Sequence, residues 1–253
     1  MQCLLLGKDS IEYGKVLQSD IDDCISMAVS VGADRHSPSL MFKGDSTFLN
    51  EDAALAIKQE QHLLMAVADS HFGYWASHAI LEGLAKQQRR IDSPAVLFTV
   101  LQDMCGTQYD IRENSETTLL VLCMNMDSGQ GFGVSFGDSS AVILNSDGYI
   151  PLNSKNDHYV TLNRFDSLTA AQADIFEFTV CREDLLVMFT DGVDECHYGH
   201  PKTSVQADHI ASLYRNNHHC HDFVRALAEL ALRGVDGNPG GQDNIAIAAA
   251  KLC

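Results

Sequence analysis

The sequence predicts an α+β fold in which antiparallel strands are segregated from helices within one domain that spans residues 1–253. Short apolar runs of strand length recur along the chain, and tight turns rich in Asn, Asp and Gly join several of them, as at 127–129 and 145–148. Segments with a helical pattern of apolar residues lie between groups of these strand-like runs. The clearest is at 221–233, where apolar residues line one face and Gly234 follows the end.

The composition limits the classes of partner. The 253 residues include 34 Asp and Glu against 17 Lys and Arg, which gives a formal net charge of −17. Because a phosphate backbone selects basic surfaces, nucleic acid is not expected as a partner. No apolar run is as long as a membrane span, and the start of the chain lacks the pattern of a signal peptide. No membrane partner is therefore expected, and a cytoplasmic location is predicted.

The first quarter of the chain contains two predicted strands. Residues 1–20 are predicted to be irregular and to form an N-terminal extension. Loose alternation of apolar residues predicts a strand at 25–31, followed by a loop over 33–46. A second strand is predicted at 48–57, where two adjacent acids interrupt it. Since adjacent side chains on a strand point to opposite faces, at most one of these acids would face a given ligand unless the strand bulges.

The stretch 63–77 contains the most informative junction in the sequence. A continuous apolar run at 63–68 predicts a strand that is buried on both faces. Asp69 and His71 follow where the run ends, and a helical pattern begins near Trp75 and continues to about residue 90. A carboxylate and an imidazole two residues apart on a rigid element suit metal binding or acid–base chemistry. Capping is the commoner use of Asp at such a position.

The middle of the chain is predicted to form a second helix and three strands. Ser93-Pro94 is a typical helix start, which predicts a helix over 95–104. After a polar connection at 106–115, three apolar runs separated by tight turns predict an antiparallel meander. The three strands are predicted at 117–126, 132–136 and 141–144.

The last part of the chain is predicted to mix strands and helices. A polar loop is expected at 153–163 and a short helix at 168–173. Apolar runs then predict strands, and periodic apolar residues predict helices. The strands are expected at 175–180, 185–189 and 245–252, and the helices at 206–214 and 221–233.

Four aspartates stand where strand-like runs begin or end: Asp69, Asp138, Asp191 and Asp243. Each has Gly or Ser within two residues, so any one of them alone is best explained as a turn residue. Together they form a set of oxygen ligands of the kind that Mg²⁺ and Mn²⁺ prefer. If these strand ends converge, the acids cannot all be ionised without cations between them.

Seven different short motifs occur one after another along the chain. They are Asn50-Glu51-Asp52, Ala68-Asp69-Ser70-His71-Phe72-Gly73, Ser115-Glu116-Thr117, Gly137-Asp138-Ser139-Ser140, Asp157-His158, Thr190-Asp191-Gly192 and Asp243-Asn244. In this order they resemble the motifs of the metal-dependent protein phosphatases, the 2C-type Ser/Thr phosphatases of the PPM superfamily. The resemblance extends from about residue 45 to the end of the chain. It implies a four-layer α-β-β-α sandwich of two antiparallel sheets flanked by helices.

The resemblance also implies a metal-binding role for five residues. Asp69, Asp191 and Asp243 would bind two Mn²⁺ or Mg²⁺ ions through their carboxylates. The backbone carbonyl of Ser70, which stands at a Gly position of the family, would bind one of the ions. Asp138 matches an Asp that belongs to a third, weaker metal site in bacterial members.

Three further residues match catalytic positions of the family. By similarity, Glu51 and Asp52 would orient water at the metals, and His71 would protonate the leaving Ser or Thr oxygen as general acid. The implied reaction is hydrolysis of phosphoserine or phosphothreonine by water that two metal ions activate. The implied partner is a phosphorylated protein or a small phosphomonoester.

The chain departs from the family pattern at several positions. Thr47 stands where members usually have an Arg that clamps the substrate phosphate. Lys43 or Arg35 from the preceding loop could reach the site instead. Ser70 adds a side chain where the family has Gly, and Ser140 replaces an Arg.

These departures leave an alternative open. Because the phosphate-clamping Arg is replaced by Thr47, the chain could be a pseudophosphatase or regulatory binding module that keeps the fold and the metal cleft but has little turnover.

Overall fold

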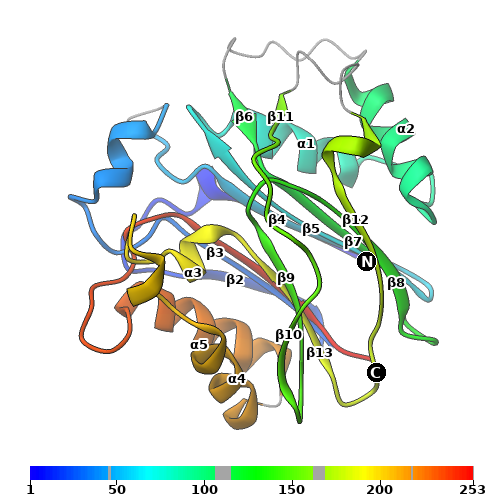
Figure 1. Cartoon of the computed structure of the whole chain (residues 1–253). Helices are drawn as coiled ribbons and strands as arrows, with labels where there is room; N and C mark the ends of the chain where they lie inside the picture. Colours follow the sequence, from blue (N-terminus) through cyan, green and yellow to red (C-terminus); the bar gives the residue numbers. More distant parts are fainter. Residues whose placement is uncertain (45–46, 106–114, 162–168, 218, 253) are drawn as a thin grey trace.

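The computed structural model describes residues 1–44, 47–105, 115–161, 169–217 and 219–252. These residues form four layers, in which two sheets pack face to face and helices cover their outer faces (Figure 1). The main helices are α1 (Trp75–Ala85), α2 (Pro94–Cys105), α4 (Ala207–Asn216) and α5 (Cys220–Arg233). The predicted α+β class and the four-layer sandwich are confirmed.

The first sheet lies against α1 and α2. In spatial order its strands are β1 (Gln2–Leu6), β4 (Asp52–Gln59), β5 (His62–His71), β7 (Leu119–Asn125), β8 (Gln130–Phe136) and β12 (Asp174–Thr179). All of its neighbouring strands are antiparallel. Two short strands widen the sheet at the C-terminal end of β5: β6 (Glu116–Thr117) pairs with the last two residues of β5, and β11 (Val160–Thr161) pairs with β6.

The second sheet lies against α4 and α5. In spatial order its strands are β10 (Gly148–Pro151), β9 (Ser140–Asn145), β13 (Leu185–Phe189), β14 (Ile245–Ala250), β3 (Ile25–Ser30) and β2 (Leu17–Asp22). These strands are also antiparallel. A short helix, α3 (Asp191–Asp194), follows β13 directly.

Strand alternation separates the core into layers. In β5, Met65 and Val67 face the second sheet, whereas Ala66 and Ala68 face α1. Burial on both faces explains why this strand reads as a continuous apolar run. A third apolar layer lies beneath α4 and α5 and includes Phe223.

The prediction of an irregular segment at 1–20 is wrong. β1 pairs with β4 at the edge of the first sheet, and β2 pairs with β3 at the edge of the second. Both are edge strands. β1 pairs with a strand that lies about 50 residues further along the chain, whereas β2 forms a hairpin with β3 and its partly exposed polar residues give only a weak local pattern.

The predicted meander is also wrong in its third strand. β7 and β8 form a hairpin in the first sheet, but β9 pairs with β10 and β13 in the second. The chain changes sheets at Gly137, which has φ +88° and packs so closely on Thr118 that a Cβ would lie 2.6 Å from its methyl carbon. A tight turn is compatible with either route, so the sequence did not distinguish a hairpin from a crossing between sheets.

The remaining differences concern segment ends and loops. Helix α1 ends at Ala85 rather than near residue 90, because the polar residues that follow offer no apolar face. The predicted loop at 33–46 contains a 3₁₀ helix, Pro38–Phe42. The polar connection predicted at 106–115 lies outside the described residues except for its last residue. Among the described residues, none of the helices is long and apolar enough to cross a membrane.

Candidate functional site

Strand alternation brings two acids together at one end of the layer between the sheets. Asp52 is the first residue of β4, and Asp69 lies opposite it on β5 as its cross-strand partner. Asp52 is fully buried and Asp69 is 6% exposed. Because each is an even number of residues from apolar side chains that face the second sheet, both carboxylates point into the same space.

The second sheet contributes residues to the same place. The Thr190 hydroxyl, just beyond β13, donates a hydrogen bond to Asp52 Oδ2 over 2.6 Å. Asp191 begins α3, and Asp243 lies two residues before β14. Gly192 allows these segments to approach, since a Cβ there would lie 1.7 Å from the carbonyl oxygen of Asn244.

The buried carboxyls have strongly raised pKa values. Burial raises the pKa of Asp52 to about 7, although the Lys43 charge and the Thr190 hydrogen bond oppose the shift. Burial, followed by the charges of Asp52 and Asp243, raises the pKa of Asp69 well above its usual range. The pKa of Asp191 is raised by burial and then by the charges of Asp69 and Asp243. This cluster of acids requires positive charge to be ionised.

Glu51 connects the loop that precedes β4 to this cluster. Its Oε1 accepts a hydrogen bond from the Gly44 backbone N–H over 2.9 Å, and its own N–H donates to Asn244 Oδ1 over 2.8 Å. Glu51 is 1% exposed, and burial raises its pKa. Since Glu51 precedes the first residue of β4, strict strand alternation does not hold between Glu51 and Asp52.

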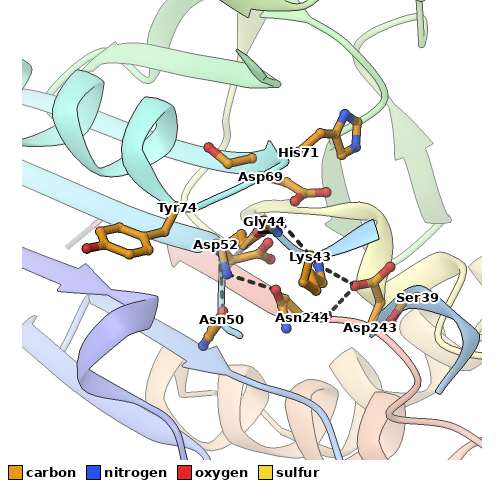
Figure 2. Close-up of polar contacts among 12 residues, drawn as sticks. Ser39, Lys43, Gly44, Asn50, Asp52, Asp69, His71, Tyr74, Asp243 and Asn244 are labelled. Atoms are coloured by element: carbon orange, nitrogen blue, oxygen red, sulfur yellow. Dashed lines mark hydrogen bonds and ion pairs between the residues drawn. The ribbon is translucent and has the colours of Figure 1, made fainter. Parts of the chain in front are cut away.

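The Lys43 ammonium lies inside the acid cluster. Its Nζ is 3.0 Å from Asp243 Oδ1 and 3.8 Å from Glu51 Oε2, and only 7% of the side chain is exposed. Figure 2 shows Lys43 between Asp52, Asp69 and Asp243. Burial alone would lower the Lys43 pKa, but the surrounding carboxylates outweigh it and raise that pKa above its ordinary value.

Of the two basic residues expected to reach the site, one does and the other does not. Lys43 lies within it, whereas the Arg35 guanidinium lies over the Tyr13 ring, 5.3 Å from the ring centre. Thr47 is exposed.

The Ser70 side chain points away from Asp69, toward α1. Its Oγ accepts a hydrogen bond from the Ser77 backbone N–H over 2.7 Å. It thereby satisfies a donor in the first turn of the helix. The hydroxyl that replaces the Gly of the family thus has a structural partner on the helix side of the sheet.

His71 and Asp138 lie around the acid cluster. The His71 side chain is 36% exposed, its Nδ1 is 3.7 Å from Glu116 Oε1, and its ring meets Tyr159 edge-on at 5.0 Å. Asp138 lies in the turn between β8 and β9, and its charge is one of those that raise the pKa of Asp191.

One ion pair beside the cluster was missed by sequence reasoning. Lys155 Nζ is 2.9 Å from Asp194 Oδ2, and Ser140 Oγ donates to the same carboxylate oxygen over 3.3 Å. Burial raises the Asp194 pKa, and Lys155 opposes that shift. The only sequence signal was that Asp194 follows Asp191 by one helical turn; nothing local indicated Lys155.

The donor set fits a divalent cation chemically. Its members are oxygen ligands, and the buried Oδ1 atoms of Asp52 and Asp191 have no hydrogen-bond partner. However, no three His, Cys, Asp or Glu side chains among the described residues converge closely enough to hold a metal ion. The ammonium of Lys43 lies among the carboxylates instead.

The sequence matches one family model. The model of Stage II sporulation protein E (SpoIIE) matches residues 69–252. This range includes Asp69, Asp138, Asp191 and Asp243. No curated protein sequence matches the chain.

Several solved structures, phosphatases among them, share the fold. A variant of a bacterial serine phosphatase has a TM-score of 0.68 at 17% identity, over 90% of this chain and 98% of that one. The catalytic domain of the serine threonine protein phosphatase PstP, in complex with two manganese ions, has a TM-score of 0.63 at 17% identity, over 94% and 99%. RsbX in complex with magnesium has a TM-score of 0.60 at 14% identity, over 94% and 100%. The resemblance that the seven motifs indicated is confirmed at the level of the fold.

Proposed function

Because this chain belongs to the Stage II sporulation protein E (SpoIIE) family, we propose that it is a metal-dependent phosphatase that removes phosphate from phosphoserine or phosphothreonine in proteins. The main support is the cluster of Asp52, Asp69, Asp191 and Asp243 from both sheets, in which Asp52 and Asp69 are buried and Asp191 and Asp243 are partly buried. So many acids in one buried place indicate a site for cations. Structural neighbours that are named as a serine phosphatase and a serine threonine protein phosphatase support the reaction class.

The proposed cofactors are two Mn²⁺ or Mg²⁺ ions, with a weaker third. Asp69, Asp191, Asp243 and the Ser70 carbonyl would bind the two ions, and Asp138 would serve the third. When bound, such ions lower the pKa of water and neutralise charge on the phosphoryl group. The manganese in PstP and the magnesium in RsbX support this class of cofactor.

The remaining roles belong to side chains around the cluster. Glu51 and Asp52 would orient water beside the ions. His71 is half-exposed at the edge of the cluster, where it could reach a substrate, and would donate a proton to the leaving oxygen. Because its Nδ1 faces Glu116, we assign this donation to Nε2.

A pseudophosphatase is the second candidate. Its support is Thr47, an exposed residue without charge at the position of the usual phosphate clamp. A small phosphomonoester remains an alternative substrate. The cytoplasmic location and the assignment of the whole chain to one phosphatase domain also stay predictions.

Turnover of p-nitrophenyl phosphate and of a phosphothreonine peptide tests the proposal. We expect hydrolysis with Mn²⁺ or Mg²⁺, none with EDTA, and loss of activity in Asp191→Asn. Asp147→Asn, which removes an exposed acid from the β9–β10 turn, is the matched control and should keep activity. Manganese binding without turnover of either substrate would contradict the proposal of an enzyme and favour the pseudophosphatase, a binding module.

A further inference from the structure

The acid cluster contains its own cation. The Lys43 ammonium lies 3.0 Å from Asp243 Oδ1, and the side chain is almost fully removed from water. A buried ammonium is strongly unfavourable unless carboxylates surround it, as they do here. Lys43 is thus part of the charge balance of the site and not a surface residue that happens to be near it.

One ammonium does not neutralise the negative charge of the acid cluster. Four carboxylates act on the Lys43 ammonium, those of Glu51, Asp52, Asp69 and Asp243, and the charges of Asp69 and Asp243 also act on Asp191. The buried Oδ1 atoms of Asp52 and Asp191 have no hydrogen-bond partner. A divalent ion has twice the charge in a smaller volume and binds several carboxylates at once. An ammonium and a divalent ion cannot both lie among the same oxygens, since they repel each other and need the same space.

The backbone at Lys43 is held independently of its ammonium. The Ser39 hydroxyl donates to the Gln242 carbonyl over 2.6 Å, and the Gly44 N–H donates to Glu51. Gly44 also packs on the backbone of Phe72 and Gly73, where a Cβ would lie 2.0 Å from the Phe72 carbonyl. The long, flexible lysine side chain can therefore leave the cluster while its backbone stays in place.

We infer that Lys43 is an internal counter-ion that competes with the divalent metal for the carboxylates of this site and is displaced when the metal binds. Lys43 then acts as a positioning residue that holds the acids together without metal and sets the metal affinity. This inference rests on the proposed function, because it requires the cluster to bind divalent metal.

The first test measures Mn²⁺ binding to the full chain by calorimetry, after metal removal, in Lys43→Met and Lys58→Met. Lys58→Met is the matched control. It also removes one positive charge, but Lys58 pairs with Asp22 away from the cluster. We expect Lys43→Met to bind Mn²⁺ about tenfold more tightly, which corresponds to about 1.4 kcal/mol. Without metal, it should melt at a lower temperature than Lys58→Met. Equal or weaker Mn²⁺ binding by a folded Lys43→Met overturns the inference.

The second test uses the unmodified chain and therefore does not depend on how the variant folds. Lysines are acylated with an amine-reactive ester in EDTA and in saturating Mn²⁺, and the labelled sites are mapped by mass spectrometry. We expect Lys43 to be protected in EDTA and labelled with Mn²⁺, while the exposed Lys86 is labelled equally in both. Protection of Lys43 with Mn²⁺ bound overturns the inference but leaves the phosphatase proposal intact. If neither the unmodified chain nor Lys43→Met binds Mn²⁺, both are overturned.

Discussion

The layer between the two sheets contains two regions that are built on the same strands. Along β4 and β5 the inward-facing pairs Ala54–Val67 and Ala56–Met65 are apolar, whereas the next pair, Asp52–Asp69, is acidic. The same period of two that buries the core also directs the acids into it. A step of two residues therefore separates a region that stabilises the fold from one that destabilises it unless cations are present.

The largest effect is expected when the acidic region is extended by one pair. Val67→Asp would place an unpaired carboxylate in the apolar region, which should lower the free energy of unfolding by about 3–5 kcal/mol. Urea unfolding measures this change. Ser146→Asp adds an acid at an exposed turn and should stay within about 0.5 kcal/mol of the parent. Equal stability of the two variants would contradict the distinction between the regions.

Removal of an acid from the acidic region should stabilise the metal-free protein. Without metal, Asp69→Asn replaces a buried carboxyl, whose ionisation burial and the neighbouring acids disfavour, with a neutral amide, so at pH 8 it should raise the free energy of unfolding. With metal, the same variant should lose more than about 100-fold in turnover, since even outer partners of metal ligands are worth 10- to 100-fold. A variant that loses both stability and turnover would show that Asp69 supports the fold itself.

The acidic region should also give the metal-free protein an unusual pH dependence. The carboxyl of Asp52 has a pKa of about 7 in the fold against an ordinary value of 3.8. A raised pKa adds stability that is present below about pH 4 and is lost as pH rises through about 7. In EDTA the melting temperature should therefore fall between pH 5 and 8, and less so in Asp52→Asn. A melting temperature that rises over this window would contradict the assignment.

The smallest effect on stability is expected on the face of β5 that packs against α1. Ser70→Ala leaves the Ser77 N–H without its acceptor, which should cost about 1 kcal/mol of stability. Because the proposed metal ligand is the Ser70 carbonyl and not its hydroxyl, Mn²⁺ affinity should change by less than about 0.5 kcal/mol. Calorimetry and thermal melting measure the two quantities. A large loss of Mn²⁺ affinity would place the hydroxyl in the metal site.

The sequence predicted the main strands and helices and the acids that meet at the strand ends. β5 and α5 were recognisable because their apolar patterns are local and strong. The roles of Asp69, Asp138, Asp191 and Asp243 were predicted by their motifs and stay predictions, whereas their approach to one another follows from the fold. By contrast, β1 was missed because its partner β4 is distant in the sequence, and β2 was missed because this partly exposed edge strand is polar.

The sequence by itself determined which side chains share one face of a strand, because strand alternation is a local property of the backbone. Only the tertiary structure decided that the chain changes sheets at Gly137, and that Lys43 lies among the carboxylates. Both depend on contacts between residues far apart in the chain. The field of several acids, which keeps a lysine buried, exists only after the two sheets have packed.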